Sequence, residues 1–395
     1  MTEPAILDGI RIVDFTWVGA GPFLTKPLAD QGADVIKIES RNRTDPIRFM
    51  SPFADGIRGV DRSGYFANRN SSKKSICLDL KNPAGQEIAM SLIETSDVVA
   101  NNYTPATLDR LGLGYADARK RRKDIIYIEM PMNGSVGPYS SHRGYGLTIA
   151  AAGGFLESSG YPDRPPVGTG TNYPDHVPNP LHGAIAVLAA LRHRDRTGVG
   201  QHIELAQLAS TANIVGPAVV AAALGRPVSR VGNDDASTLW QGVVRTQGPD
   251  RWCALTLRDE ADVEAASSVL ASSTLSGLRG RIEIGEEIAA CVRERDAEDL
   301  AEQLCNAGIA ASPVNDARDL LCDPQLVSRE HWVTLDHPEM GPCVYDAPPY
   351  RSATTSPRLR TPAPLLGADT RLVCETILGI SSTEFDLLES EGAFG

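Results

Sequence analysis

The sequence predicts an α/β fold with a parallel sheet, and two observations support this prediction. Short apolar runs typical of strands occur at residues 11–15 and 34–39, and residues 23–31 between them are typical of a helix. A strand, a helix and a second strand at this spacing form a βαβ unit, whose two strands are parallel. The same alternation of strand-like and helix-like segments returns over residues 75–130.

Further segments extend the pattern along the chain. Strands and helices are expected in alternation, with strands over residues 75–80, 97–101 and 125–130 and helices over residues 83–96 and 147–156. Residues 243–257 are typical of a β-hairpin with a Gly-Pro-Asp turn, and residues 259–310 are helix-rich and acidic. These later segments indicate a second region with α+β character.

A change of composition separates the two regions. Residues 226–237 are polar and contain Pro, Gly and Asp, which is typical of a linker. We therefore expect a Rossmann-like large domain that begins with residues 1–225 and a smaller α+β domain over residues 226–342. Residues 343–395 are expected to return to the large domain, which is then built from both ends of the chain.

Composition argues against several classes of protein. The 395 residues carry a net charge of −12, which disfavours nucleic acid as a general partner. The seven cysteines include no CxxC pair, so we expect neither a disulfide framework nor a structural metal, and a cytoplasmic location. The first residues lack the features of a signal peptide. Residues 205–225 are uncharged but interrupted by polar residues and Pro217, so a buried helix is expected rather than a membrane span.

Residues 168–201 contain the first candidate catalytic group. The first third of this stretch is rich in Gly, Pro and Asn, which is typical of irregular backbone, and a helix is expected from Gly183 onward. Asp175 is the acid in that loop. A carboxylate placed there can act as a nucleophile, but it can equally be a turn or N-cap residue. His176 and His182 lie nearby without the spacing of a metal motif, so no metal site is predicted.

The loop after the first expected strand matches a dinucleotide-binding turn only in part. Gly19 and Gly21 supply two glycines of a GxGxxG motif, but Leu24 replaces the third, while Glu39 has the spacing of the ribose-binding acid. A tight turn into a helix explains the same residues equally well. Ser135 lies in NGSVG, which lacks the first glycine of a nucleophile elbow, so a serine hydrolase is not predicted.

Basic side chains follow several of the expected strands. In open α/β sheets, ligands bind at the loops beyond the carboxyl ends of the strands, and basic residues there can pair with phosphates. The candidates for a phosphate-bearing ligand are Arg41, Arg43, Lys73, Lys74, Arg110 and Arg143. Ordinary solvated surface charge is the alternative for each of them.

Longer motifs, taken in order, resemble one enzyme family. Residues 7–39 read LDGIRIVDFTWVGAGPFLTKPLADQGADVIKIE, and residues 68–85 read NRNSSKKSICLDLKNPAG. Further matching segments are residues 101–115, 175–205, 307–343 and 363–370. Together they closely resemble the class III coenzyme A transferases, and the resemblance covers nearly the whole chain.

The resemblance implies a mechanism and a set of binding residues. Asp175 corresponds to a nucleophile that attacks an acyl-CoA thioester, giving an acyl-aspartyl anhydride and then an aspartyl-CoA thioester. The family's contacts to coenzyme A correspond here to Val18, Ala20, Lys73, Asn102, Tyr103, Arg110 and Arg143. Where formyl-CoA transferase has Gln and Arg, this chain has Gly19 and Ser40, with Arg41 next, which leaves the acyl substrate open. The resemblance also implies an interlocked homodimer with acyl-CoA and carboxylic acid substrates.

Two alternatives remain beside CoA transfer. The same family contains α-methylacyl-CoA racemases, which pair an Asp like Asp175 with a His in a Gly-His-Asp motif. This chain has Gly144, Tyr145 and Gly146 there, with His142 nearby, so the second acid/base that racemisation needs is missing. A non-catalytic acyl-CoA-binding protein is the other alternative, and the presence of Asp175 argues against it.

Overall fold

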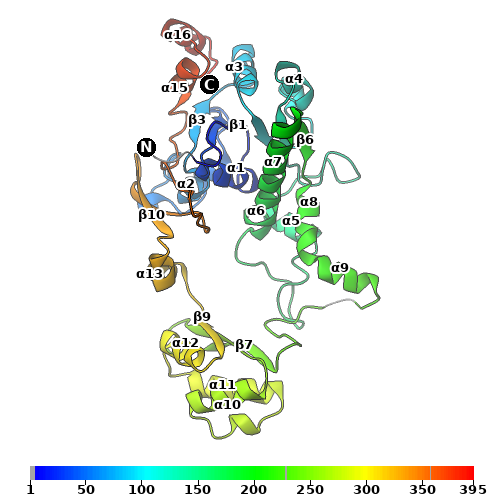
Figure 1. The fold of residues 1–395 in the computed structure, drawn as a ribbon, viewed down its shortest axis with the longest axis vertical. Coiled ribbons are helices and arrows are strands. Elements are labelled where there is room, and N and C mark those ends of the chain that lie inside the picture. Colours follow the sequence, from blue (N-terminus) through cyan, green and yellow to red (C-terminus); the bar gives the residue numbers. More distant parts are fainter. Residues whose placement is uncertain (1–4, 227–228, 356) are drawn as a thin grey trace. The chain divides into compact units, whose positions relative to one another are not determined.

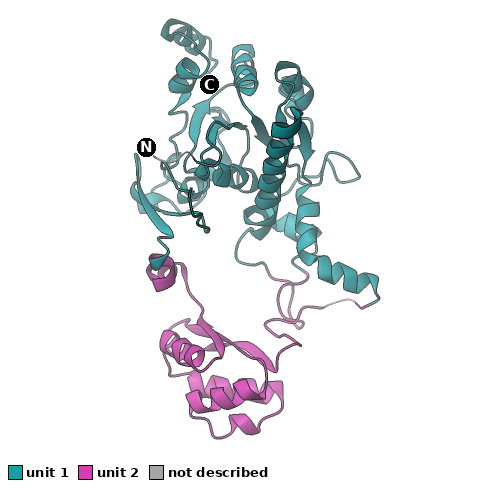
Figure 2. Ribbon diagram, in the orientation of Figure 1, with its two compact units in different colours: residues 1–156, 168–225, 328–395 teal, residues 157–167, 226–327 magenta. Residues whose placement is uncertain are grey.

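The computed structural model describes residues 5–226, 229–355 and 357–395, and the chain forms two compact units, shown in Figure 2. Unit 1 comprises Met1–Leu156, Gly168–Gly225 and Ser328–Gly395, and unit 2 comprises Glu157–Val167 and Arg226–Val327. This division differs from the expected ranges in two places. Residues 157–167 belong with unit 2, and the chain returns to unit 1 at Ser328 rather than at residue 343.

A six-stranded parallel sheet forms the centre of unit 1, as the sequence predicts. Its order is β3-β2-β1-β4-β5-β6, and every neighbouring pair is parallel. The strands are β1 (Arg11–Asp14), β2 (Asp34–Glu39), β3 (Lys74–Cys77), β4 (Val98–Asn101), β5 (Ile126–Glu129) and β6 (Gln201–Glu204). The strand order reverses between β1 and β4. In doubly wound sheets a ligand crevice opens at this switch point, beyond the carboxyl ends of the two strands.

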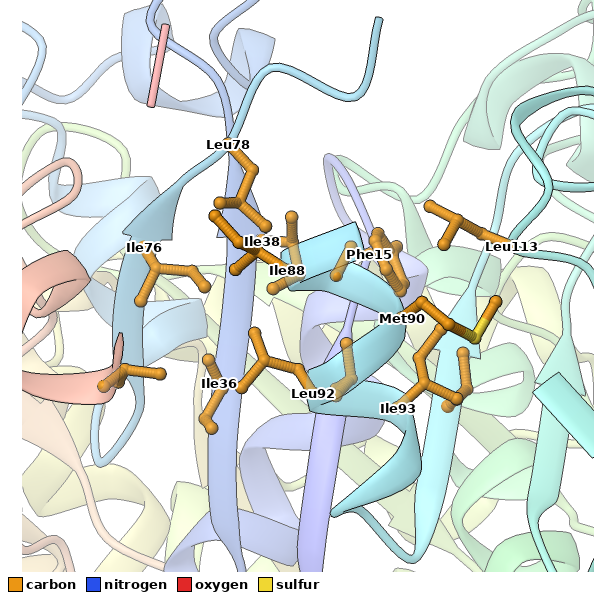
Figure 3. Close-up of a cluster of buried hydrophobic side chains, with 14 of the residues drawn as sticks. Phe15, Ile36, Ile38, Ile76, Leu78, Ile88, Met90, Leu92, Ile93 and Leu113 are labelled. Atoms are coloured by element: carbon orange, nitrogen blue, oxygen red, sulfur yellow. The ribbon is translucent and has the colours of Figure 1, made fainter. Parts of the chain in front are cut away.

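Two hydrophobic clusters pack helices against this sheet. One cluster joins α1 (Ala20–Asp30) and α7 (Pro178–Thr197) to the strands, and Figure 1 shows these two helices beside each other. The other joins α3 (Pro83–Glu94) and α4 (Tyr115–Arg121), and Figure 3 shows Leu92 and Ile93 of α3 facing the strand residues. The C-terminal helices α15 (Thr370–Thr376) and α16 (Ser382–Ser390) contribute Val373 and Phe385 to this second cluster, which explains why the chain end returns to unit 1.

The hairpin of β10 (Trp332–His337) and β11 (Gly341–Asp346) explains the early return to unit 1. Tyr345 of this hairpin is buried in a cluster with Ile47 and Phe66. The hairpin thus shares a core with unit 1, although most of it lies within the range expected for the small domain.

Unit 2 has a hydrophobic core of its own. Its antiparallel sheet consists of β7 (Trp240–Arg245), β8 (Trp252–Leu257) and β9 (Ala310–Pro313). The helices of the unit are α10 (Glu260–Leu270), α11 (Arg281–Val292), α12 (Ala297–Asn306), α13 (Ala317–Cys322) and α14 (Pro324–Ser328). Strands β7 and β8 form the predicted hairpin, and helices α10 to α12 bury apolar residues with this sheet.

The segment expected as one buried helix is different in the structure. It forms α8 (Gln207–Ala212), a 3-10 turn and α9 (Gly216–Ala223). Residues of α9 are not buried in this single chain, and the side chains of Val219 and Val220 are 57% and 59% exposed. The expectation of a buried helix is therefore wrong for α9 in the isolated chain. Among the described residues no helix is both long and apolar enough to cross a membrane.

The region around Asp175 is more regular than the sequence suggests. Asp175 lies in a short helix, α6 (Tyr173–His176), instead of an irregular loop, and α7 begins at Pro178 rather than at Gly183. Proline is tolerated in the first turn of a helix because the N–H it lacks has no intrahelical partner there. The Pro residues that predict a loop thus mark a helix start.

Candidate active site

Asp175 lies where α6 packs against α1 and α5 (Gly146–Ala152). Its side chain is buried, with the residue only 7% exposed. Gly19, just before α1, and Gly146, the first residue of α5, approach it closely. A Cβ at Gly146 would lie 2.6 Å from Asp175 Oδ2, and a Cβ at Gly19 would lie 3.2 Å from Asp175 Cβ. Both positions therefore favour glycine because the side chain of Asp175 occupies the space that a Cβ would need.

Few groups compensate the charge of the Asp175 carboxylate. The backbone N–H of Gly146 donates a hydrogen bond to it, and Gly146 is the first residue of a helix, where N–H groups lack intrahelical partners. Across the described ranges, no Lys or Arg forms an ion pair with Asp175. Burial raises the pKa of Asp175 to about 6, and the Gly146 hydrogen bond only partly opposes this rise. At neutral pH the group is a mostly ionised and poorly solvated carboxylate.

Tyr65 and His176 form a polar pair beside Asp175. Tyr65 Oη and His176 Nε2 are 2.7 Å apart, and Thr171 Oγ1 lies 2.9 Å from His176 Nδ1. Burial and, to a smaller extent, the Arg69 guanidinium together lower the pKa of His176 to about 4, so the imidazole is neutral at physiological pH. Burial also raises the pKa of Tyr65, which therefore keeps its proton.

Sequence reasoning missed Tyr65 and Arg69 and considered His176 only as a metal ligand. Arg69 lies over the Phe23 ring, 4.2 Å from its centroid, within the segment NRN that carries the family resemblance. A polar aromatic residue three positions before this segment is the one sequence signal that could have indicated Tyr65.

The switch point brings together four of the residues predicted to contact coenzyme A. Val18 and Ala20 follow β1, and Asn102 and Tyr103 follow β4. Asn102 Oδ1 accepts a hydrogen bond from the Trp17 backbone N–H, and Asn102 Nδ2 donates to the Trp17 carbonyl, both at 2.8 Å. The loops after β1 and β4 are thereby joined at the place where a ligand is expected.

Four predicted phosphate ligands are exposed cations. They form no ion pair with any described carboxylate, and they are Arg41, Arg43, Arg110 and Arg143. Arg110 Nη2 donates to Thr107 Oγ1 at 3.1 Å, and its remaining N–H groups can reach solvent. Cations of this kind are available to an anionic ligand. Among the other basic candidates, Lys74 forms an ion pair with Asp34.

The surroundings of Lys73 differ from those of the exposed cations. Its side chain is fully buried, and Nζ lies 3.2 Å from Asp14 Oδ2, 2.9 Å from the Pro22 carbonyl, 2.8 Å from Thr25 Oγ1 and 3.0 Å from Asn70 Oδ1. An ammonium group has three N–H donors, and four acceptors already surround this one. Burial lowers the pKa of Lys73 to about 8, against the attraction of Asp14. Lys73 therefore supports the loop from inside and does not present its charge to a phosphate.

The two remaining histidine candidates have contacts outside this set of residues. His142 is exposed and lies 5.2 Å from the Tyr139 ring. His182 Nδ1 and Ser210 Oγ are 2.8 Å apart, so His182 has a partner within the fold. In the part of the chain that the structure describes, no group of three or more His, Cys, Asp or Glu side chains is arranged to hold a metal ion.

Comparison with known proteins gives consistent matches. The family described as CoA-transferase family III matches residues 7–370. The chain is 32% identical to a protein of Mycobacterium tuberculosis named a probable CoA-transferase, over 97% of this chain and 50% of that protein, so it spans half of that relative's length. It is 32% identical to the succinyl-CoA:mesaconate CoA-transferase of Haloarcula hispanica, over 91% and 93% of the two chains. A crystal structure of a CAIB/BAIF family protein from Brucella suis superposes with a TM-score of 0.84 and 26% identity, covering 94% and 99% of the two chains.

Proposed function

This chain belongs to CoA-transferase family III, and from that premise we propose that Asp175 is its nucleophile in moving coenzyme A from an acyl-CoA to a carboxylic acid. The observation that supports this role is the state of its carboxylate. Asp175 is buried between two glycines, accepts a hydrogen bond from Gly146 and has no cationic partner among the described residues. A carboxylate that is ionised but poorly solvated is a stronger nucleophile than one in water.

The proposed reaction needs no net proton transfer. A carboxylate oxygen of Asp175 attacks the thioester carbonyl, the C–S bond breaks, and CoA leaves as a thiolate while an acyl-aspartyl anhydride remains. The thiolate attacks the aspartyl carbonyl and releases the first acid as a carboxylate, which leaves an aspartyl-CoA thioester. The acceptor carboxylate repeats these two steps in reverse, giving the new acyl-CoA and restoring Asp175. The neutral states of Tyr65 and His176 fit a site in which charge moves without protons.

Binding of coenzyme A is proposed at the switch point. Val18, Ala20, Asn102 and Tyr103 would line the path of the pantetheine arm, and the exposed guanidinium groups of Arg41, Arg110 and Arg143 would meet the phosphates. Lys73 does not enter this set, because its ammonium group is enclosed by four acceptors.

We propose a dicarboxylic acid as one of the two acids. The relatives carry names that specify such substrates, including succinyl-CoA and mesaconate in Haloarcula hispanica, succinate and glutarate in Agrobacterium fabrum, and oxalate in Streptomyces coelicolor. Which acid this chain uses is open, because Gly19 and Ser40 differ from the residues of formyl-CoA transferase.

Racemisation has no observation in its favour. The position that would hold the second acid/base, the His of the Gly-His-Asp motif, holds Tyr145, which is exposed. Gly146, the next residue, offers Asp175 only a backbone N–H, which cannot serve as a second proton carrier at neutral pH.

A homodimer is also proposed. Along α7 the side chains of Leu181, Ile185 and Leu188 are exposed at helical spacing, and α9 exposes Val219 and Val220. Apolar faces of this kind indicate an interface. We expect light scattering to give the mass of two chains, and a stable monomer would contradict the proposal.

The test of the proposed function follows CoA by mass spectrometry. The wild-type protein is incubated with a panel of acyl-CoAs and with dicarboxylic and monocarboxylic acids, in parallel with Asp175→Asn. We expect at least one pair to exchange CoA in the wild type, and exchange to be lost in a variant that still binds CoA. Exchange at the wild-type rate by Asp175→Asn would contradict the role of Asp175. Incorporation of solvent deuterium at the α-carbon of the acyl-CoA, without CoA exchange, would support the racemase alternative.

A further inference from the structure

Val18 has an unusual backbone conformation. Its φ angle is +61°, in the left-handed region, although it is a β-branched residue. Residues with a branched Cβ are rarely found there, and such outliers persist only when surrounding contacts hold them. Val18 directly precedes Gly19, which packs on Asp175. The contacts that hold Val18 therefore bear on the geometry around Asp175.

Buried side chains from several elements bind the backbone of this loop. Asp14 Oδ1 accepts from the Thr16 N–H at 2.8 Å, and Lys37 Nζ donates to the Thr16 carbonyl at 2.5 Å. At Val18, the backbone N–H donates to Asp45 Oδ1 and Oδ2 at 3.1 and 3.3 Å. Together with the two hydrogen bonds between Asn102 and the Trp17 backbone, these contacts occupy every backbone N–H from Thr16 to Val18.

Asp45 is itself fixed from the opposite side. Its carboxylate lies 3.2 Å from Lys37 Nζ, and both side chains are fully buried. Lys37 is on β2, so the position of Asp45 is tied to the central sheet. One ion pair thus holds both ends of the strained segment, through the Thr16 carbonyl and the Val18 N–H.

We propose that Asp45, fixed by Lys37, is a positioning residue that keeps Val18 in the left-handed conformation and thereby keeps Gly19 packed against Asp175. This inference rests on the proposed role of Asp175 as the nucleophile. Without the Asp45 carboxylate, the Val18 N–H loses its acceptor and the strained conformation loses its support. The loop can then relax toward an ordinary φ angle, and Gly19 moves away from Asp175.

The alternative is a purely structural role. Asp45 also accepts from the Ile47 N–H at 3.1 Å and caps the 3-10 turn Pro46–Phe49. An Asp45 variant can therefore lose stability for reasons that have nothing to do with Val18. The two roles predict different results for Asp45 variants. A positioning role predicts that the loss caused by the variant depends on the residue at position 18 and changes the surroundings of Asp175. A purely structural role predicts neither.

The first test does not depend on the reaction. Unfolding by urea is followed at pH 5 and pH 8 for the wild type, Asp175→Asn, Asp45→Ala and the double variant. In the wild-type background we expect Asp175→Asn to raise the free energy of unfolding by more at pH 8 than at pH 5. At pH 8 the substitution removes a buried charge, whereas at pH 5 the carboxyl group is mostly protonated. In the Asp45→Ala background this pH-dependent gain should fall to less than half, because water reaches Asp175. An unchanged gain would overturn the proposal, whatever reaction the protein catalyses.

The groups next to Asp175 do not contribute to the expected pH dependence. Tyr65 and His176 are the titratable side chains next to Asp175. Burial raises the pKa of Tyr65 and lowers the pKa of His176 to about 4, so neither changes charge between pH 5 and pH 8. Asp30→Ala is the matched control, because it breaks a buried ion pair with Lys26 within α1, whereas the hydrogen bonds to the loop described above come from other residues. The pH-dependent gain from Asp175→Asn should remain complete in the Asp30→Ala background.

The second test measures CoA exchange and asks whether the effect of Asp45 depends on the left-handed conformation of residue 18. Asp45→Ala should lower kcat roughly tenfold to a hundredfold, the range for a displaced reacting group, with a smaller change in KM for the acyl-CoA. In the Val18→Gly background, where the left-handed conformation is free of strain, the same substitution should lower kcat no more than about threefold. Equal losses in both backgrounds would overturn the proposal. If Asp45→Ala does not fold, Asp45→Asn replaces it. The amide oxygen keeps an acceptor for the Ile47 and Val18 N–H groups but loses the ion pair with Lys37 that fixes residue 45. The loss of kcat should then be smaller, and it should still be absent in the Val18→Gly background.

Discussion

Two buried aspartates of unit 1 show how the surroundings separate a structural acid from a reactive one. Asp14 is fully buried and is bound by the Thr16 and Thr25 hydroxyls and by Lys73. Burial acts to raise the pKa of Asp14, but Lys73, Lys37 and the hydroxyl donors outweigh it and hold the pKa below its ordinary value. Asp175 has only the Gly146 N–H, and burial raises its pKa to about 6. The structural acid has its lone pairs occupied, whereas the candidate nucleophile keeps them available.

The largest expected effect is on the free energy of unfolding, which should fall when Asp14 is replaced by Asn and rise when Asp175 is. Asp14→Asn removes the partner of a buried ammonium group, so it should destabilise unit 1 by about 3–5 kcal/mol. Asp175→Asn should stabilise it by about 3 kcal/mol above pH 6, because the folded pKa lies above the unfolded value near 3.8 and ionisation is penalised there. Below pH 4 both states are protonated and this gain should vanish. Urea unfolding across this pH range measures both effects, and a loss of stability in Asp175→Asn at pH 8 would contradict the contrast.

A smaller effect is expected when the space around the reactive acid is filled. In Gly146→Ala the new Cβ would lie 2.6 Å from Asp175 Oδ2 and 2.8 Å from Asn172 Cβ, so the carboxylate or α5 must shift. We expect CoA exchange to fall roughly a hundredfold, with CoA binding retained. Gly56→Ala is the matched control for added side-chain volume, since nothing lies within 4 Å of its Cβ position, although its positive φ adds backbone strain. Wild-type exchange in Gly146→Ala would show that the contact is not needed.

The smallest effect concerns an exposed cation. Arg110→Ala should weaken CoA binding by about 1–3 kcal/mol, the range for a hydrogen bond to a charged group, without changing the pH dependence of exchange. Calorimetry with CoA and with dephospho-CoA then shows whether Arg110 meets the 3′-phosphate, because only in that case does the variant stop distinguishing the two ligands. Arg119→Ala, an exposed arginine on α4, should bind CoA as the wild type does. Equal affinities for wild type and Arg110→Ala would return Arg110 to ordinary surface charge.

The sequence predicts much of the fold because the strands of unit 1 are local apolar patterns. Residues 11–15, 34–39 and 125–130 are expected as strands, and each contains a strand of the parallel sheet. The exposure of α9 could not be predicted in this way. An uncharged segment has the same sequence pattern whether it is buried within its own chain or against another molecule.

The sequence predicts the candidate catalytic residue but not the residues that surround it. Asp175 is conspicuous as an acid within a Gly- and Pro-rich stretch, yet Gly19 and Gly146 approach it from distant parts of the chain. For Lys73, too, the sequence does not reveal the partners of the side chain. Its basic turn suggests a phosphate ligand, but its partner Asp14 lies 59 residues earlier and encloses the charge. Pairing across the fold, rather than residue type, decides which charges are available.

The most direct measurement of the central claim is the location of the covalent intermediate. Wild-type protein is given an acyl-CoA without an acceptor acid, treated with hydroxylamine and digested, and the peptides are sequenced by mass spectrometry. An aspartyl hydroxamate on the peptide that contains Asp175, absent from Asp175→Asn and from samples without acyl-CoA, is the predicted result. A hydroxamate on another residue, or CoA exchange by the wild type with no trapped adduct at Asp175, would contradict it.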